Sequence, residues 1–158
     1  AADRRAWVEV IAYDADDNVV YTSGAVPDGT PVVDLDDPDL WEIRDFTYDA
    51  EGQPAHFFWE VASVLSATLP APTARSLLDP SYTDIHRSRL YRYEGPLPAR
   101  VTLRVNIRPI GLDILQDLVD SGDLDPSFVD AMQTLTLGFT ELTWTPELGG
   151  PCIPVPVQ

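Results

Sequence analysis

The first residues that could do chemistry are oxygen ligands in a short acidic loop. Asp14, Asp16 and Asn18 have the alternate spacing with which calcium loops begin, because alternate residues of a tight loop can point at one hard cation. Val19 stands where an EF-hand loop needs glycine, and Ala25 stands where it needs a bidentate glutamate. A calcium site and a solvated turn without metal are therefore both interpretations of this loop, since Asp and Asn also favour plain turns.

Catalytic chemistry has few candidates in this chain. His56 and His86 are the only histidines, and nothing in the sequence brings them together as an acid–base pair or a metal site. Cys152 is the single cysteine, which excludes an internal disulfide, a Cys-rich zinc site and a CxxCH haem attachment. The GxSxG, P-loop, dinucleotide-binding and HExxH motifs do not occur. We expect a protein that is not an enzyme and has no cofactor of its own, with calcium as the alternative.

Arginine clusters in the middle of the chain. All 10 basic residues are arginines, and six of them lie close together in the sequence: Arg87, Arg89, Arg92, Arg100, Arg104 and Arg108. If two predicted strands, 85–93 and 100–107, pair with each other, guanidinium groups meet at about 5 Å, which is repulsive unless carboxylates lie between them. The arginines are interpreted either as an internal network with acids of the same chain or as a docking surface for an acidic partner or for haem propionates.

Four tryptophans could form a third kind of site. An aromatic platform on which sugar rings stack and an ordinary core are both possible uses of Trp7, Trp41, Trp59 and Trp144. Because one tryptophan is expected on each of several strands, the core interpretation is favoured. Exposed, coplanar rings would favour carbohydrate binding.

The charge of the chain limits its partners and its domain count. The 26 acidic and 10 basic residues give a net charge of −16, which disfavours binding to nucleic acid phosphates. Residues 1–51 have a net charge of −11, residues 75–110 of +4 and residues 111–158 of −8. Because separate domains would each keep an unneutralised charge, we expect one domain over 1–148, followed by a Pro-rich extension at 149–158. No apolar run is long enough to predict a membrane span. No signal segment opens the chain, so we expect a mature protein or an excised domain.

Alternating hydrophobic patterns predict the first strands. Residues 6–13 and 19–21 predict a hairpin around the acidic turn, with both faces of its first strand covered. Residues 41–48 and 55–59 repeat the pattern around a second turn. Because the Tyr-Asp-Ala triplets of the two turns begin 35 residues apart, we expect two turns built alike. The apolar residues of 57–69 also fit one face of a helix.

The second half of the chain adds strands and helices. The strand over 100–107 alternates between apolar and polar residues. The apolar residues are expected to face the core: Val101, Leu103, Val105 and Ile107. The polar residues are expected to face away from it: Arg100, Thr102, Arg104, Asn106 and Arg108. Helical spacing begins at Leu112 and stops at Gly122, and Asp125-Pro126 starts a second short helix. A last strand is expected over 134–144. These elements predict a mainly β fold, an immunoglobulin-like or related antiparallel β-sandwich of about seven strands, with two short helices near the C-terminal third.

Three stretches resemble the haem-free, β-rich C-terminal domain of bacterial multihaem c-type cytochromes. They are Tyr13-Asp14-Ala15 through Val20-Tyr21-Thr22-Ser23-Gly24, which is similar to that family's D..G.VVY.SG, then Asp49 through Trp59, and Ala99 through Pro109. The similarity covers most of residues 5–140. The chain departs from the family because Asn18 replaces the glycine of the first turn and because no CxxCH occurs.

The resemblance implies an accessory module beside electron-carrying haems, in the periplasm or outside the cell. It implies a non-catalytic structural or interaction role in an exported redox protein, with the haem-bearing portion of the same or another protein as partner and no haem in these residues. The alternative is a freestanding cell-surface module that binds carbohydrate or calcium.

Overall fold

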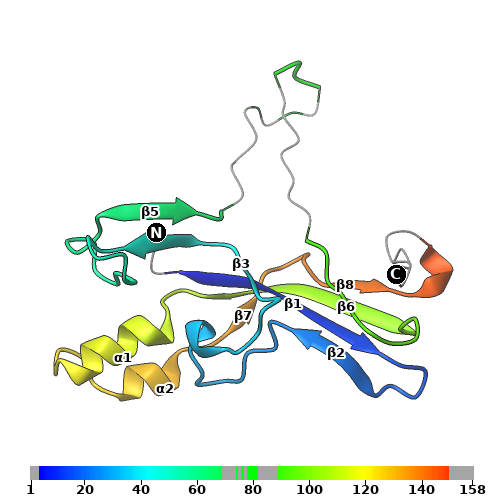
Figure 1. The fold of residues 1–158 in the computed structure, drawn as a ribbon, viewed down its shortest axis with the longest axis horizontal. Helices are drawn as coiled ribbons and strands as arrows, with labels where there is room; N and C mark the ends of the chain where they lie inside the picture. The colour runs from blue at the N-terminus through cyan, green and yellow to red at the C-terminus, as the bar shows by residue number, and fades with distance from the viewer. Residues whose placement is uncertain (1–3, 69–73, 75, 77, 82–88, 150–158) are drawn as a thin grey trace.

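The computed structural model describes residues 4–68, 74, 76, 78–81 and 89–149. Within them the chain is mainly β, with antiparallel strands in two sheets and two short α-helices (Figure 1). This architecture confirms the predicted sandwich-like β fold with two helices in its C-terminal third. In the described part of the chain, no helix is long and apolar enough to cross a membrane.

The larger sheet has a long central pair of strands with shorter strands outside it. Its strands are β1 (Arg5–Tyr13), β2 (Val19–Ser23), β3 (Trp41–Glu42), β6 (Arg100–Arg108), β7 (Leu135–Thr136) and β8 (Leu142–Trp144). β1 pairs with β6, while β2 and β3 extend the sheet beyond β1 and β7 and β8 extend it beyond β6. The antiparallel pairing of β1 with β2 confirms the first predicted hairpin.

The partner of β6 is not the predicted one. β6 pairs with β1 over the whole length of both strands, whereas residues 89–93 form no strand. The predicted strand over 85–93 is wrong in that part, and residues 82–88 lie outside the described residues. Pairing with β1 sets Glu9 opposite Arg104, which is an attractive pair, whereas the predicted pairing would have set arginines against arginines.

The smaller sheet is a two-stranded hairpin, β4 (Asp45–Tyr48) with β5 (Ser63–Ser66). The predicted return strand over 55–59 is wrong, because the chain leaves the ladder after one bridge between Tyr48 and Pro54 and turns at 57–60. Pro54 has no N–H to donate to a continuing ladder. The helix considered over 57–69 is also wrong for its described residues, 57–68, since that turn and β5 lie within them.

Both predicted helices are confirmed as α1 (Leu112–Asp120) and α2 (Ser127–Ala131). Gly122, at a φ of 83°, follows the end of α1, and Asp125 accepts a hydrogen bond from the Ser127 N–H at 2.9 Å where α2 begins. The single last strand predicted over 134–144 is wrong, because a turn at 137–140 divides it into β7 and β8.

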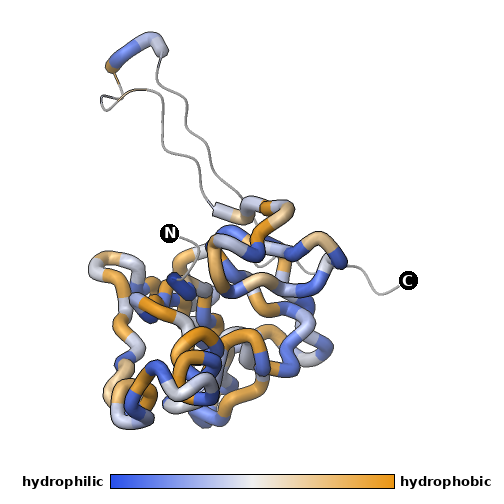
Figure 2. Tube along the Cα trace, turned by 90° about the vertical axis from the view of Figure 1, so that its left-hand side faces the viewer, coloured by the Kyte–Doolittle hydropathy of each residue, from blue (hydrophilic) through white to orange (hydrophobic). Residues whose placement is uncertain are grey.

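The core lies around β1. Its buried apolar residues come from β1, from the loop after β2, from the second turn and from α1: Trp7, Val8, Val10, Ala12, Val32, Ala55, Leu112, Ile114 and Leu115. Neighbouring residues of a strand point to opposite faces, so the burial of both Trp7 and Val8 confirms that both faces of β1 are covered. Seen from the side on which α1 and α2 lie, hydrophobic and hydrophilic residues are interspersed along the trace (Figure 2).

The polar face of β6 enters this core at one end. Asn106 and Arg108 are only 3% and 1% exposed, so the prediction that these two face away from the core is wrong. The residues of the opposite face are half-buried: Val101, Leu103, Val105 and Ile107. Gly24 passes close under β1, because its φ is 69° and a Cβ there would lie 2.1 Å from the Val8 carbonyl oxygen. This passage lets the Gly24 carbonyl accept a hydrogen bond from the Trp7 indole at 2.9 Å.

Candidate interaction surfaces

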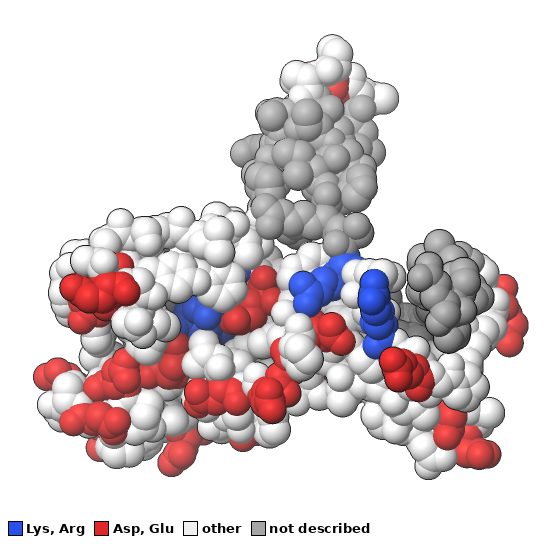
Figure 3. Space-filling model, in the orientation of Figure 1, with Lys and Arg blue, Asp and Glu red and all other residues white. Residues whose placement is uncertain are grey.

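Two of the predicted docking arginines pair with acids of the same chain. Arg104 contacts Glu9 through two hydrogen bonds, from Nε to Oε1 at 2.7 Å and from Nη2 to Oε2 at 3.0 Å. Arg100 donates to Asp17 at 2.9 Å, and its guanidinium carbon lies 3.7 Å from the centre of the Tyr13 ring. Hydrogen bonding to these carboxylates raises the pKa of both arginines. Acidic and basic groups therefore alternate where a purely basic surface was one interpretation (Figure 3).

Arg108 is a core residue, and its predicted place on an exposed face is wrong. Its Nε donates to Thr134 Oγ1 at 2.9 Å, its Nη1 to the Thr30 carbonyl and its Nη2 to the Pro27 carbonyl at 3.3 Å. The guanidinium also lies 5.3 Å from the centre of the Trp7 ring, and burial lowers its pKa. Arg108 thus fastens the loop after β2 to the end of β6.

Arg89 and Arg92 are exposed in the described part of the chain. Arg89 donates a long hydrogen bond, 3.4 Å, to the carbonyl of Pro38. Arg87 lies outside the described residues. Docking of an acidic partner or of haem propionates through Arg89 and Arg92 stays a prediction.

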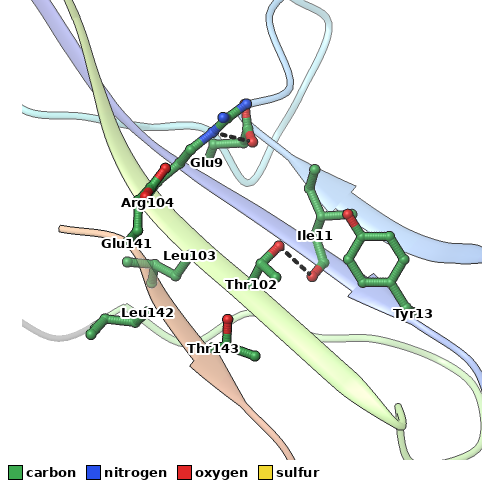
Figure 4. Close-up of a pocket in the computed structure, with 9 residues that line it drawn as sticks. All are labelled: Glu9, Ile11, Tyr13, Thr102, Leu103, Arg104, Glu141, Leu142 and Thr143. Atoms are coloured by element: carbon green, nitrogen blue, oxygen red, sulfur yellow. Dashed lines mark hydrogen bonds and ion pairs between the residues drawn. The ribbon is translucent and has the colours of Figure 1, made fainter. Parts of the chain in front are cut away.

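A groove of about 320 Å³ follows the exposed half of the β1–β6 face. Its lining comes from three strands and the residue before β8: Glu9, Ile11, Tyr13, Thr102, Leu103, Arg104, Glu141, Leu142 and Thr143. In Figure 4, the Glu9–Arg104 pair lies at one end and Tyr13 at the other, with β8 along one side. The sequence gives no signal for this groove, because its walls are far apart along the chain and meet only when β1, β6 and β8 pair.

The first acidic turn uses its oxygens on the chain itself. Asp14 Oδ1 accepts hydrogen bonds from the N–H groups of Asp16 and Asn18, both at 2.9 Å, and Oδ2 accepts one from the Asn18 side chain at 3.0 Å. These bonds, chiefly those from Asn18, lower the pKa of Asp14. The described residues contain no group of three His, Cys, Asp or Glu side chains placed to hold a metal ion. Calcium binding at Asp14, Asp16 and Asn18 stays a prediction.

The second turn repeats the first. Asp49 Oδ1 accepts hydrogen bonds from the N–H groups of Glu51 at 3.0 Å and Gln53 at 2.7 Å, at the same spacing as in the first turn. The Asp49 N–H donates to the Gln53 carbonyl at 2.8 Å, as its counterpart does in the first turn. Gly52 has a φ of 79°, where Asp17 has 61°. The prediction of two turns built alike is confirmed.

His56 lies between two carboxylates of α1. Its Nδ1 is hydrogen-bonded to Asp117, and its Nε2 lies 3.6 Å from Asp113, which also pairs with Arg5 at 2.6 Å. Both acids lie more than 50 residues away from His56 in the sequence, so no local pattern predicts these contacts. The ring links the segment after the second turn to α1. His86 and Cys152 lie outside the described residues.

The residues after His56 form an aromatic turn at the surface. The rings of Phe57 and Trp59 stack with centres 4.9 Å apart and planes 1° apart, and Phe58 meets Trp59 edge-on at 4.9 Å. Phe58 and Trp59 are 84% and 67% exposed. Of the four tryptophans only Trp7 is buried, so the core interpretation fails for Trp59.

This turn continues into an exposed apolar strand. Val64 and Leu65 of β5 are 58% and 60% exposed, on opposite faces of the hairpin, and we name the exposed group Phe58, Trp59, Val64 and Leu65 the aromatic hairpin surface. No charged residue occurs from Val61 to Thr68, and the surface over β5 is uncharged in Figure 3. The sequence pattern could not place this surface, because exposed and buried apolar residues have the same composition and spacing. This group of exposed apolar side chains makes the hairpin a candidate interaction surface.

Comparison of the chain with protein-family models, with curated proteins and with solved structures returns no match.

Proposed function

We propose that this chain is a non-catalytic interaction module of an exported redox protein. It holds a haem-bearing portion, of the same protein or of a partner, beside the β domain in the periplasm or outside the cell. The aromatic hairpin surface is the observation that carries the docking role. The redox setting is supported by the resemblance of three stretches to the haem-free domain of multihaem c-type cytochromes.

The aromatic hairpin surface has the composition of an interface centre. Tryptophan and other aromatic residues dominate the binding energy of protein interfaces, and apolar burial contributes about 25 cal/mol per Å² removed from water. Trp59 stacks on Phe57 and contacts Phe58 edge-on, so little side-chain freedom is lost when a partner covers it. A two-stranded hairpin alone has marginal stability, and a partner that covers β5 would stabilise it.

The redox half of the proposal is tested on the native protein. An antibody raised to this domain captures the protein from its source organism, and intact mass and visible absorption are measured. A mass well above 17.5 kDa, together with a Soret band, supports a haem-free module of a cytochrome. A mass near that of this chain without visible absorption contradicts it.

Carbohydrate binding is the second candidate function, and the exposed indole of Trp59 is the observation that favours it. The indole stacks on Phe57 and meets Phe58 edge-on, yet Trp59 is 67% exposed, which leaves aromatic surface for a sugar ring. The test is a glycan array with Trp59→Ser beside Trp41→Phe as a control. Glycan signals that are lost only in Trp59→Ser support this candidate, and an array without signals for the unaltered chain contradicts it.

A further inference from the structure

Phe139 combines two features that a surface loop normally avoids. Its φ is 65°, a left-handed backbone conformation that glycine adopts freely and that a bulky side chain disfavours. Its side chain is fully exposed, with a relative accessibility of 107%. The ring therefore gains no packing within the described chain that offsets its backbone strain. Strained backbone conformations cluster at functional sites, so this outlier motivates a search for a function of Phe139.

The turn that carries Phe139 is fastened to β6 on both sides. The Leu137 N–H donates to the Val105 carbonyl at 2.8 Å, and the Val105 N–H donates to Thr140 Oγ1 at 3.1 Å. The Thr140 hydroxyl in turn donates to the Leu137 carbonyl at 2.7 Å, which closes the turn. Phe139 is thus presented from a rigid base, and binding costs little ordering of the backbone.

The groove between β1, β6 and β8 begins beside this turn. Glu141, Leu142 and Thr143 line it, and Glu141 is only two residues beyond Phe139. A cavity of roughly 150 Å³ holds a benzene ring, so a groove of about 320 Å³ has room for one phenylalanine side chain. The projecting ring and the groove are therefore close neighbours along the chain.

We propose that Phe139 inserts into the β1–β6–β8 groove of a second copy of this chain, forming a reciprocal dimer. A twofold interface uses the same patch on both subunits, which requires a patch that contains both the projection and its receptor. Charge points to the same occupant. Each chain has a net charge of −16, but residues 131–140 contain no charged residue, and the two acids that line the groove, Glu9 and Glu141, are partly offset by Arg104, which is hydrogen-bonded to Glu9.

The test is sedimentation equilibrium of the 158-residue chain from about 1 to 200 μM. The unaltered chain should form dimers, and Phe139→Ala and Phe139→Gly should each weaken dimerisation at least tenfold. Phe139→Gly is the safer variant for folding, because glycine relieves the strained φ. Its urea midpoint should lie above that of Phe139→Ala, which keeps the strain but lacks the ring.

A complementation experiment tests the groove itself. Thr143→Trp fills the groove from the exposed strand β8, so this variant alone should also be monomeric. Mixed with Phe139→Gly it should form heterodimers, because one partner keeps the ring and the other keeps the open groove. The proposal is overturned if the unaltered chain is monomeric at 200 μM, if Phe139→Ala dimerises as well as the unaltered chain, or if the mixture stays monomeric.

Discussion

Replacing Arg108 by methionine should destabilise the protein although arginine is usually a surface residue. Its buried guanidinium makes three hydrogen bonds, to Thr134, Thr30 and Pro27, and each hydrogen bond from a charged donor contributes about 1.5–3 kcal/mol. The loss of these hydrogen bonds is partly offset, because burying the cation of Arg108 costs several kcal/mol of desolvation and the methionine variant avoids this cost. The expected net loss is about 3 kcal/mol of unfolding free energy.

Urea unfolding followed by tryptophan fluorescence measures this loss, since Trp7 lies beside Arg108. Arg92→Met is the matched control, because the same change at an exposed arginine should alter the unfolding free energy by less than about 0.5 kcal/mol. Arg108→Lys should not restore stability, because one ammonium cannot reach acceptors placed around a planar guanidinium. If Arg108→Met and Arg92→Met have equal stability, Arg108 is not the core residue described above.

Three further predictions concern the glycine passage, alkaline pH and the acidic turns. Gly24→Ala should cost about 3 kcal/mol or more in urea unfolding, because the new methyl group would lie 2.1 Å from the Val8 carbonyl oxygen; an unchanged midpoint would refute this close approach. Burial, together with a hydrogen bond to a carboxylate, raises the pKa of Tyr21, so the folded state holds the Tyr21 proton more tightly than the unfolded chain does. Stability should therefore be insensitive to this group below about pH 10 and fall above it, and Tyr21→Phe should reduce that fall; equal slopes for both proteins would count against it. Asp14→Ala and Asp49→Ala should lower the melting temperature by similar small amounts, and calcium or EDTA should not change it, because the turn oxygens already accept hydrogen bonds; a calcium-dependent rise would show a metal site instead.

Local signals predicted much of this fold. The alternation in residues 6–13 marks β1 because a strand buried on both faces needs apolar residues on each, and the Asp-Pro start and Gly122 stop mark the helices because they satisfy or end backbone hydrogen bonding there. The duplicated turns followed from the repeated Tyr-Asp-Ala triplet, since an aspartate in that place accepts the same two backbone N–H groups each time.

Long-range pairing and exposure could not be predicted in this way. The sequence does not say whether β6 pairs with β1 or with its neighbour in the chain, and that choice decides which side chains oppose each arginine. Arg108 stands at a polar position of an alternating strand, yet the loop after β2 covers it and supplies its acceptors. Arg108 is a polar residue that is buried, whereas Trp59 and Phe139 are hydrophobic residues that are exposed. Exposed hydrophobic residues cannot be told from core residues in a sequence.

Photo-crosslinking from the aromatic hairpin surface tests the docking claim most directly. A photoreactive phenylalanine derivative replaces Phe58 in the native protein of the source organism, and a second variant carries it at Val19, which is 57% exposed on the other sheet. The proposed function predicts that position 58, and not position 19, is crosslinked to a polypeptide that carries covalent haem. Absence of a haem-bearing product at position 58, or equal yields at the two positions, would contradict docking through this surface.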